Sequence, residues 1–155
     1  AQVDDAVEAL QSLLPDYCIQ ASAFSCATTR KGWSGVAMMW RKDLRWQPSV
    51  TWKSFEDEPE GRVLHMELPR LHTVLAYVPN SGDSLQRLQW RVTHWDPSLR
   101  NFLKNLAKSK PVLLLGDLNA AHRDVDIWNL EAPHVPKSAS TTPEERASFG
   151  KLLEA

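Results

Sequence analysis

Apolar positions follow a helical period at the start of the chain and strand periods after it. An apolar residue at every third or fourth position from 3 to 14 predicts a helix. The short apolar run at 35–40 favours a buried strand, and the alternation at 62–68 is typical of a half-buried one. A second strand is predicted at 71–78. It ends before Pro79, because proline has no N–H to donate to a neighbouring strand. These two strands are close enough in sequence to form a hairpin.

Helical and strand patterns alternate in the second half of the chain. Residues 84–95 carry apolar side chains on one face, and we expect Asp96 and Pro97 to interrupt this pattern and to begin a new helix. Apolar residues at helical spacing continue that helix over 99–106. The apolar run 112–115 is too short for a helix and predicts a buried central strand.

The last part of the chain reads as an irregular loop followed by a helix. Residues 120–141 are rich in Pro, Ser, His and Asp and favour loop structure. Thr142, Pro143 and Glu145 form a helix start with a capping hydroxyl, a first-turn proline and a capping-box glutamate. Strands interleaved with helices predict a layered α/β domain in which helices cover sheet faces.

Composition limits the class of protein without naming it. The chain has 155 residues, 43% of them apolar, which suffices for one globular domain or a piece of one. No apolar run reaches the length of a membrane span and no signal-peptide pattern opens the chain, so we expect an intracellular protein without a membrane partner. The helical patterns run to both termini, and we therefore expect 1–155 to be an incomplete domain, truncated at both ends.

Neither the net charge nor the cysteine count identifies a partner or a metal site. The formal net charge of −1 provides no global basic field, so a nucleic-acid partner has to be argued from local motifs. Cys18 and Cys26 are too few for a disulfide framework or a four-ligand zinc site. We expect both to be ordinary reduced thiols.

The strongest chemical signal is the sequence GDLN at 116–119, directly after the predicted central strand. Glycine allows the backbone to turn, Asp117 offers a carboxylate for a hard cation or a water proton, and Asn119 offers an amide. This combination at a strand end suits a magnesium-assisted attack on a phosphate. A simple Asx turn that ends the strand is equally compatible with these four residues.

A second polar group follows the second strand of the hairpin, in the sequence AYVPN at 76–80. The hydroxyl of Tyr77 can donate to a phosphate oxygen, and Asn80 can position the same group without a change of charge. Taken alone, these residues are better explained as a boundary aromatic and a turn. Together with GDLN, they place polar groups at the ends of two strands.

The motifs and their order resemble the exonuclease III-type apurinic/apyrimidinic endonucleases of the endonuclease/exonuclease/phosphatase superfamily. The resemblance covers most of the chain from Lys31 onward. GDLN is shared widely in that superfamily, whereas AYVPN together with KGWSG points to the DNA-repair branch. The matching segments are KGWSGV at 31–36, EGRV at 60–63, AYVPN at 76–80 with RL at 87–88, KPVLLLGDLNAAH at 110–122 and TPEER at 142–146.

The resemblance implies a four-layered α/β sandwich that cuts the DNA backbone 5′ to an abasic sugar, as in base excision repair. It further implies associated 3′ exonuclease or 3′ phosphodiesterase activity and a requirement for Mg²⁺, with Mn²⁺ as a substitute. Tyr77 would contact the scissile phosphate, Asp117 would activate or orient the attacking water, and Asn119 would assist. Asp117 and Asn119 would also be metal ligands.

The same resemblance assigns substrate contacts. Arg62 and Asn80 match substrate-contacting positions, and Trp33 stands where the family often places an aromatic against DNA. The implied partner is double-stranded DNA containing abasic sites, bound by a monomer that is nuclear if the source is eukaryotic.

Departures from the family pattern lower the expected activity of this chain. The family's upstream metal-binding glutamate and its downstream aspartate and histidine have no counterpart here, so we expect the 155 residues alone to be inactive. His65 and His72 do not supply the missing histidine and are expected to be exposed strand residues. Asp83 occupies a loop position where some relatives place an arginine against DNA. Ser140 and Thr141 replace a glycine and an aromatic near the pocket.

Two further functions stay open. The chain could be another phosphodiesterase of the superfamily, such as a retrotransposon endonuclease or an inositol or lipid phosphatase. It could also be a DNA-binding domain that keeps the scaffold without the reaction.

Overall fold

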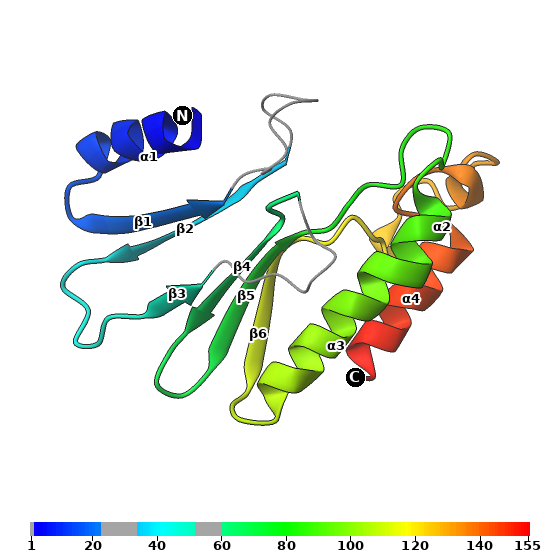
Figure 1. Ribbon diagram of the computed structural model, residues 1–155. Coiled ribbons are helices and arrows are strands. Elements are labelled where there is room, and N and C mark those ends of the chain that lie inside the picture. Colours follow the sequence, from blue (N-terminus) through cyan, green and yellow to red (C-terminus); the bar gives the residue numbers. More distant parts are fainter. Residues whose placement is uncertain (1, 23–33, 52–59) are drawn as a thin grey trace. The chain divides into compact units, whose positions relative to one another are not determined.

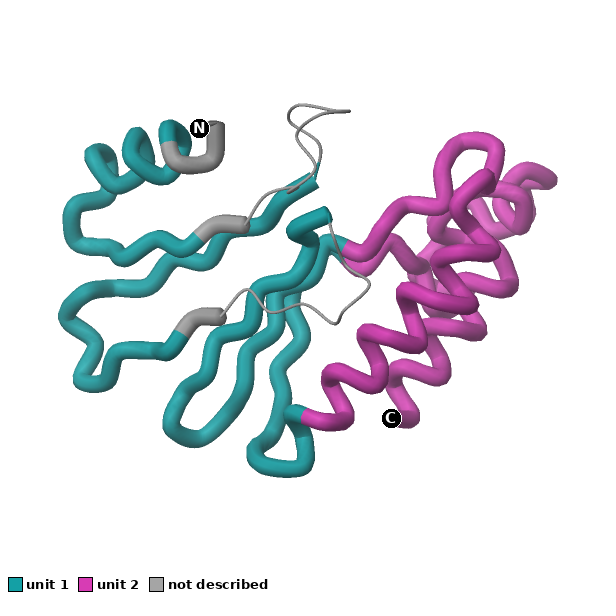
Figure 2. Tube along the Cα trace, viewed as in Figure 1, with its two compact units in different colours: residues 1–77, 106–117 teal, residues 78–105, 118–155 magenta. Residues whose placement is uncertain are grey.

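The computed structural model describes residues 2–22, 34–51 and 60–155, and Trp33 and Cys26 lie outside these ranges. The chain forms two compact units, which are described separately below (Figure 2). Unit 1 comprises residues 1–77 and 106–117, and unit 2 comprises residues 78–105 and 118–155.

Unit 1 begins with a helix and a two-stranded antiparallel sheet (Figure 1). The predicted first helix is confirmed as α1, Gln2–Leu13. Strand β1, Tyr17–Ser22, pairs with β2, Val36–Arg41, and β2 confirms the strand predicted at 35–40. The hydrophobic pattern had not indicated β1, since only six residues with a mixed pattern form it.

The second sheet of unit 1 has four strands in the order β3-β4-β5-β6. The predicted hairpin is confirmed: β4 and β5 are antiparallel, and Leu68 N donates to Leu71 O across the turn at 2.9 Å. The strand predicted at 112–115 is present as β6, which lies beside β5 in parallel and extends two residues further, through Asp117. The expectation that this strand is buried and central was wrong for the described residues, because β6 is the last strand in the sheet order and Leu113 and Leu115 are exposed. The strands are β3, Ser49–Thr51; β4, Val63–Glu67; β5, His72–Tyr77; and β6, Val112–Asp117.

Burial in this sheet is concentrated on the central strands. Leu64 on β4 and Val74 and Ala76 on β5 are fully buried. Side chains on both faces of β5 are buried, which indicates that both faces of the sheet are covered at this central strand and explains why the alternation is lost there. The strand that ends at Tyr77 is therefore anchored along its length.

The expectation that His65 and His72 are exposed was wrong. His72 is buried and His65 half-buried, with Nε2 of His65 2.9 Å from Nδ1 of His72. Nε2 of His72 in turn lies 2.9 Å from Oγ of Ser109. The two imidazoles face each other across the hairpin, because the residues lie on neighbouring strands of the same antiparallel pair.

One continuous helical segment extends from Leu88 to Ala107. It consists of α2, Leu88–Trp90, a π-helical turn η1, Arg91–Trp95, and α3, Asp96–Ala107. The expected break at Asp96 and Pro97 was wrong, because Asp96 has helical dihedral angles and its N–H donates to Arg91 O. A wide turn, in place of a break, precedes the proline.

Unit 2 also contains the irregular stretch and the final helix that the sequence predicts. Residues 120–141 hold only two short turns of 3₁₀-helix, η2 at Asp124–Asp126 and η3 at Val135–Lys137. The final helix is α4, Pro143–Leu153, and its capping box is present: Glu145 N donates to Thr142 Oγ1 at 3.2 Å. The buried apolar residues around which unit 2 packs include Val78, Trp95, Leu99 and Val135.

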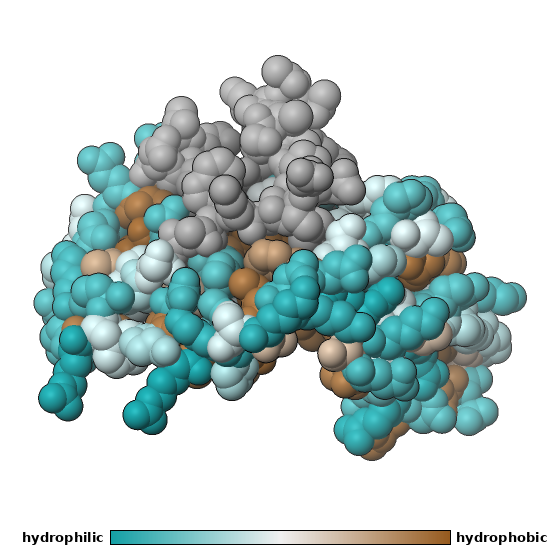
Figure 3. All heavy atoms as spheres, turned by 60° about the horizontal axis from the view of Figure 1, so that its bottom comes forward, coloured by the Kyte–Doolittle hydropathy of each residue, from teal (hydrophilic) through white to brown (hydrophobic). Residues whose placement is uncertain are grey.

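The structure confirms a mixed α/β fold with two small sheets and helices. Within the described residues, no helix is long and apolar enough to cross a lipid bilayer. Polar residues cover most of the surface seen in Figure 3, with apolar residues between them.

Candidate functional site

The parallel pairing of β5 and β6 brings Tyr77 and Asp117 side by side. Each is the last residue of its strand, and the register pairs the two directly. Both strands run in the same direction, so their carboxyl ends meet at one edge of the sheet (Figure 1). Asp117 is exposed and Tyr77 half-buried. The backbone positions of the predicted hydroxyl and carboxylate residues are therefore direct neighbours in the sheet.

Gly116 is what allows β6 to approach β5 so closely at this end. Its φ of +123° is a conformation that side-chain-bearing residues rarely adopt. A Cβ added there would overlap the carbonyl oxygen of Ala76 on β5. The lack of a side chain at Gly116 thus lets β6 pair with β5 up to its last residue, which places Asp117 beside Tyr77.

Arg62 supports the Tyr77 end of β5. Its guanidinium lies 4.7 Å from the centre of the Tyr77 ring and donates through Nη1 to Tyr77 O at 3.3 Å. Nε donates to Glu60 Oε2 at 2.5 Å, and the Arg62 side chain is 2% exposed. The structure thus places Arg62 in contact with one of the predicted catalytic residues, and a contact with substrate stays a prediction.

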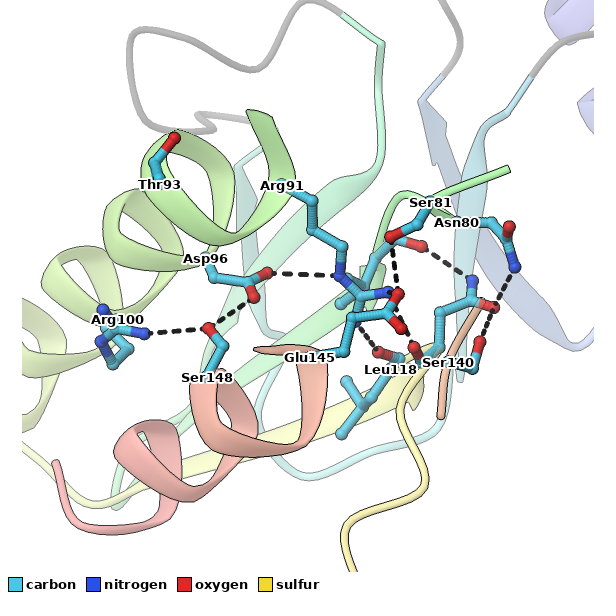
Figure 4. A network of polar contacts seen from close by, with 12 residues as sticks. Asn80, Ser81, Arg91, Thr93, Asp96, Arg100, Leu118, Ser140, Glu145 and Ser148 are labelled. Atoms are coloured by element: carbon cyan, nitrogen blue, oxygen red, sulfur yellow. Dashed lines mark hydrogen bonds and ion pairs between the residues drawn. The ribbon is translucent and has the colours of Figure 1, made fainter. Parts of the chain in front are cut away.

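Unit 2 carries the amide members of the predicted site in one hydrogen-bonded cluster. Asn80 Nδ2 donates to Asn119 Oδ1 at 3.1 Å, and Asn119 Nδ2 donates to Val78 O at 2.8 Å (Figure 4). Ser140 Oγ donates to the same Asn119 Oδ1 at 3.3 Å. Ser140, which the sequence showed only as a departure, is therefore part of the cluster.

The backbone of this amide cluster is held in uncommon conformations. Asn119 has a φ of +45° and Ser140 a φ of +72°. Asparagine tolerates the left-handed region better than most residues, which suits it to position 119. Gly82 N donates to Asn80 Oδ1 at 2.8 Å, an Asx-type turn that fixes the other amide.

A buried charged network, absent from the sequence prediction, contacts the segments that carry the cluster. Arg91 donates to the carbonyl oxygens of Leu118 and Asn119 and pairs with Glu145 (Figure 4). From the sequence, Glu145 is predicted only to be the glutamate of the capping box. Charged residues that recur on predicted helices look like solvated surface positions, so no local signal distinguishes Arg91 from its neighbours.

The remaining predicted positions are placed as follows. Asp83 is exposed in the loop after Gly82. Trp33 lies outside the described residues, and its proposed stacking on DNA stays a prediction.

The donor set for a metal is incomplete in the part of the chain that the structure describes. No group of three or more His, Cys, Asp or Glu side chains converges there. Asp117 fits a ligand of a hard cation, because it is an exposed carboxylate at a strand end. Asn119 fits less well, since its Oδ1 already accepts hydrogen bonds from Asn80 and Ser140. Magnesium prefers several oxygen ligands, and these residues alone do not supply them.

Comparison with known protein families identifies the family of the chain. The profile described as the Endonuclease/Exonuclease/phosphatase family matches residues 2–151. The chain belongs to this family. As a member of the endonuclease/exonuclease/phosphatase family, it carries GDLN and AYVPN at the strand ends where the parallel pair β5 and β6 terminates.

Relatives in this family include DNA-repair nucleases. The chain is 42% identical over 128 residues to the DNA repair nuclease APEX1 of Danio rerio, covering 81% of this chain and 39% of that protein. It is 34% identical over 151 residues to an exodeoxyribonuclease of Streptococcus pneumoniae, covering 95% of this chain and 53% of the other. The chain thus spans about half the length, or less, of these relatives.

The same kinship is seen in three dimensions. The crystal structure of the AP endonuclease LMAP from Leishmania major superposes with a TM-score of 0.79 at 26% identity. The match covers 97% of this chain and 53% of the other. The α/β fold therefore corresponds to about half of an AP endonuclease structure.

Proposed function

We propose that the protein acts as a metal-dependent DNA-repair phosphodiesterase that cuts the DNA backbone 5′ to abasic sites. The observation that carries the proposal is the direct pairing of Tyr77 with Asp117 at the ends of two parallel strands. Relatives described as a DNA repair nuclease and as exodeoxyribonucleases support this choice of substrate. Associated 3′ exonuclease or 3′ phosphodiesterase activity belongs to the same proposal.

Each of the four polar residues has its own role in the proposed hydrolysis of the phosphodiester. Tyr77 donates a hydrogen bond to a non-bridging phosphate oxygen and so stabilises charge that develops in the transition state. Asp117 orients the attacking water and accepts its proton. Asn80 and Asn119, already fixed to each other, hold the phosphate or the water in place.

A metal ion and the DNA contacts complete the proposal. Asp117, with Asn119, would hold Mg²⁺ or Mn²⁺, which supplies positive charge next to the phosphate. Arg62 and Trp33 would contact the DNA around the abasic sugar. The protein would act as an intracellular monomer on double-stranded DNA.

Removal of the Asp117 carboxylate is the test of this function. In the full-length product of the gene, we expect Asp117→Asn to lower cleavage of a duplex with a synthetic abasic site by about 100- to 1000-fold, with DNA binding nearly unchanged, because one preorganised catalytic group is lost. Asp16→Asn, which removes an exposed carboxylate in the turn after α1, is the matched control and should cleave normally.

The same assay separates the alternatives. Near-normal cleavage by Asp117→Asn would contradict the role given to this carboxylate. Hydrolysis of inositol phosphates, or of intact DNA with no preference for the abasic site, would point to another phosphodiesterase of the family. Binding of the abasic duplex without any cleavage by the parent protein would favour a non-catalytic DNA-binding domain.

A further inference from the structure

Arg91 is a buried cation that donates hydrogen bonds to three oxygen atoms in unit 2. Its Nη1 donates to Asn119 O at 2.8 Å and to Glu145 Oε1 at 2.8 Å, and its Nη2 donates to Leu118 O at 3.0 Å. The side chain is 2% exposed. One guanidinium therefore binds two successive carbonyl oxygens of the loop that carries Asn119.

Glu145 links this cation to the segment that carries the second amide. It is fully buried, and its Oε1 accepts hydrogen bonds from Arg91 and from Ser81 Oγ, the latter at 2.6 Å. Its Oε2 accepts from Thr142 Oγ1 at 2.7 Å. Because Ser81 directly follows Asn80, one carboxylate connects the segments of both amides (Figure 4).

A second carboxylate lies on the other side of the guanidinium. Asp96 Oδ1 is 3.7 Å from Arg91 Nε, and Asp96 Oδ2 accepts from Ser148 Oγ at 2.6 Å. Nε itself has no hydrogen-bond partner among the residues described. Arg91 thus sits between two acidic groups, and only its Nη atoms make the directional contacts.

Stability alone is a poor reason for such a network. A buried ion pair loses the hydration of both charges, and well-packed apolar residues of similar volume stabilise a fold equally well or better. A guanidinium offers something that apolar residues do not, which is a planar set of donors in fixed directions. In this protein those donors fix the orientation of the Leu118–Asn119 peptide, where Asn119 has a φ of +45°.

We propose that Arg91 is a positioning residue that, through Glu145, sets the placement of Asn80 and Asn119 relative to each other. The proposal rests on the proposed function for its catalytic consequence. Arg91 touches neither substrate nor metal in this scheme. It acts through the backbone of the Asn119 loop and through the Glu145–Ser81 contact on the other side.

The decisive variant is Arg91→Lys, which keeps the positive charge and loses the planar donor set. The variant is to be made in a Gly150→Ala background. Gly150 lies in α4, and alanine stabilises a helix relative to glycine, which offsets stability lost with Arg91→Lys. Cleavage of the synthetic abasic duplex should show kcat reduced about 10- to 100-fold with KM within about twofold, because the amides are displaced and not removed. The side-chain amide protons of Asn80 and Asn119 should exchange with solvent faster.

Ser148→Ala in the same background is the matched control. It removes the hydrogen bond to Asp96 at the far side of the network and should lower the melting temperature. It leaves the contacts of Arg91 with the Asn119 loop intact, so kcat and side-chain amide exchange should not change. A loss of stability alone would therefore not reproduce the effect of Arg91→Lys.

Three outcomes would overturn the proposal. Arg91→Lys with parental kcat and parental amide exchange would show that the donor geometry is not needed. Equal loss of kcat in Ser148→Ala would assign the effect to general stability. Failure of Arg91→Lys to fold in the stabilised background would make Arg91 a requirement of folding and not of positioning. If the parent itself does not cleave, the proposed function fails, and amide exchange alone decides the role of Arg91.

Discussion

At the scale of single residues, a few backbone positions decide where the polar groups point. Gly116 and Asn119 flank the Asp117–Leu118 pair and both have positive φ, at +123° and +45°. The first has no room for a Cβ beside Ala76, and the second keeps its conformation with help from Arg91. The chemistry of GDLN therefore depends on residues that carry no reactive group.

The glycine gives a direct prediction about stability. Gly116→Ala should lower the free energy of unfolding by roughly 2–5 kcal/mol, because the methyl group overlaps Ala76 O and the backbone conformation is strained. Gly150→Ala is the control: its Cβ would meet only His122 Nε2 at 3.5 Å, and alanine in a helix should add up to about 1 kcal/mol. Urea unfolding measures both. Equal stability of the two variants would contradict the steric role of Gly116.

The imidazole pair provides a second residue-scale effect. Partial burial, followed by the nearby His72, holds the pKa of His65 below its usual value, and Lys110 acts in the same direction. The carboxylate of Glu67 opposes this shift. Since the folded state binds a proton at His65 less readily than the unfolded chain does, protonation favours unfolding.

The sign of the pH dependence follows. Stability should be unaffected by His65 above its usual pKa of about 6.5 and should fall as the pH decreases below that value. We expect His65→Asn to flatten the decline of the melting temperature between pH 7.5 and pH 5.5, values chosen to bracket that pKa at about one unit on each side. His94→Asn, which removes an exposed imidazole, should keep the parental slope. An unchanged slope in His65→Asn would show that this pair does not carry the effect.

At the scale of elements, the π-helical turn η1 aligns charges that a regular helix would separate. Asp96 N–H donates to Arg91 O, five residues back, and the side chains of these residues lie 3.7 Å apart. In an α-helix, residues five apart differ in direction by about 140°. The wide turn thus brings Arg91 and Asp96 to one face, and π turns of this kind are frequent at functional sites.

Deletion of Thr93 tests the importance of this turn. A regular α-helix would replace the wide turn and rotate Arg91 by about 100° away from its partners. We expect the free energy of unfolding to fall by about 3–5 kcal/mol, the range for a buried ion pair that loses one partner. Thr93→Ala, which removes only an exposed hydroxyl bonded to Gln89 O and His94 Nδ1, should cost about 0.5 kcal/mol or less. Thermal unfolding that is alike in the deletion and in Thr93→Ala would refute the alignment role.

At the scale of the whole molecule, the chain holds some but not all of the parts that hydrolysis requires. Tyr77 and Asp117 belong to unit 1, and Asn80 and Asn119 belong to unit 2. The chain spans 39% and 53% of the two relatives compared by sequence. The described residues contain no cluster of three metal-binding side chains. A hard cation bound by Asp117 with so few partners would be held weakly.

This shortage predicts the behaviour of the 155 residues by themselves. We expect no magnesium-dependent cleavage of an abasic duplex by this chain alone, since charge stabilisation by a well-held ion is a large part of such catalysis. The full-length gene product, assayed at the same concentration, is the positive control. Robust cleavage by the short chain, lost on addition of EDTA, would show that the residues present already form a working site.

The sequence by itself determined the local elements and the identities of the candidate groups. Apolar periodicity located β2, β4, β5 and β6, and capping chemistry located α4, because these signals lie within a few residues of each other. The order of the motifs led to the family that the profile match then showed. The sequence missed β1 and β3, whose short strands have no clear alternation.

Only the tertiary structure decided which residues are neighbours. The register that pairs Tyr77 with Asp117, and the bonds from Arg91 to the Asn119 loop, join residues 27 to 40 positions apart in the chain. The burial of His72 and the continuity of the helix through Pro97 were likewise decided by packing and not by local pattern. Burial and long-range hydrogen bonds depend on the whole fold, and a pattern of neighbouring residues in sequence does not contain them.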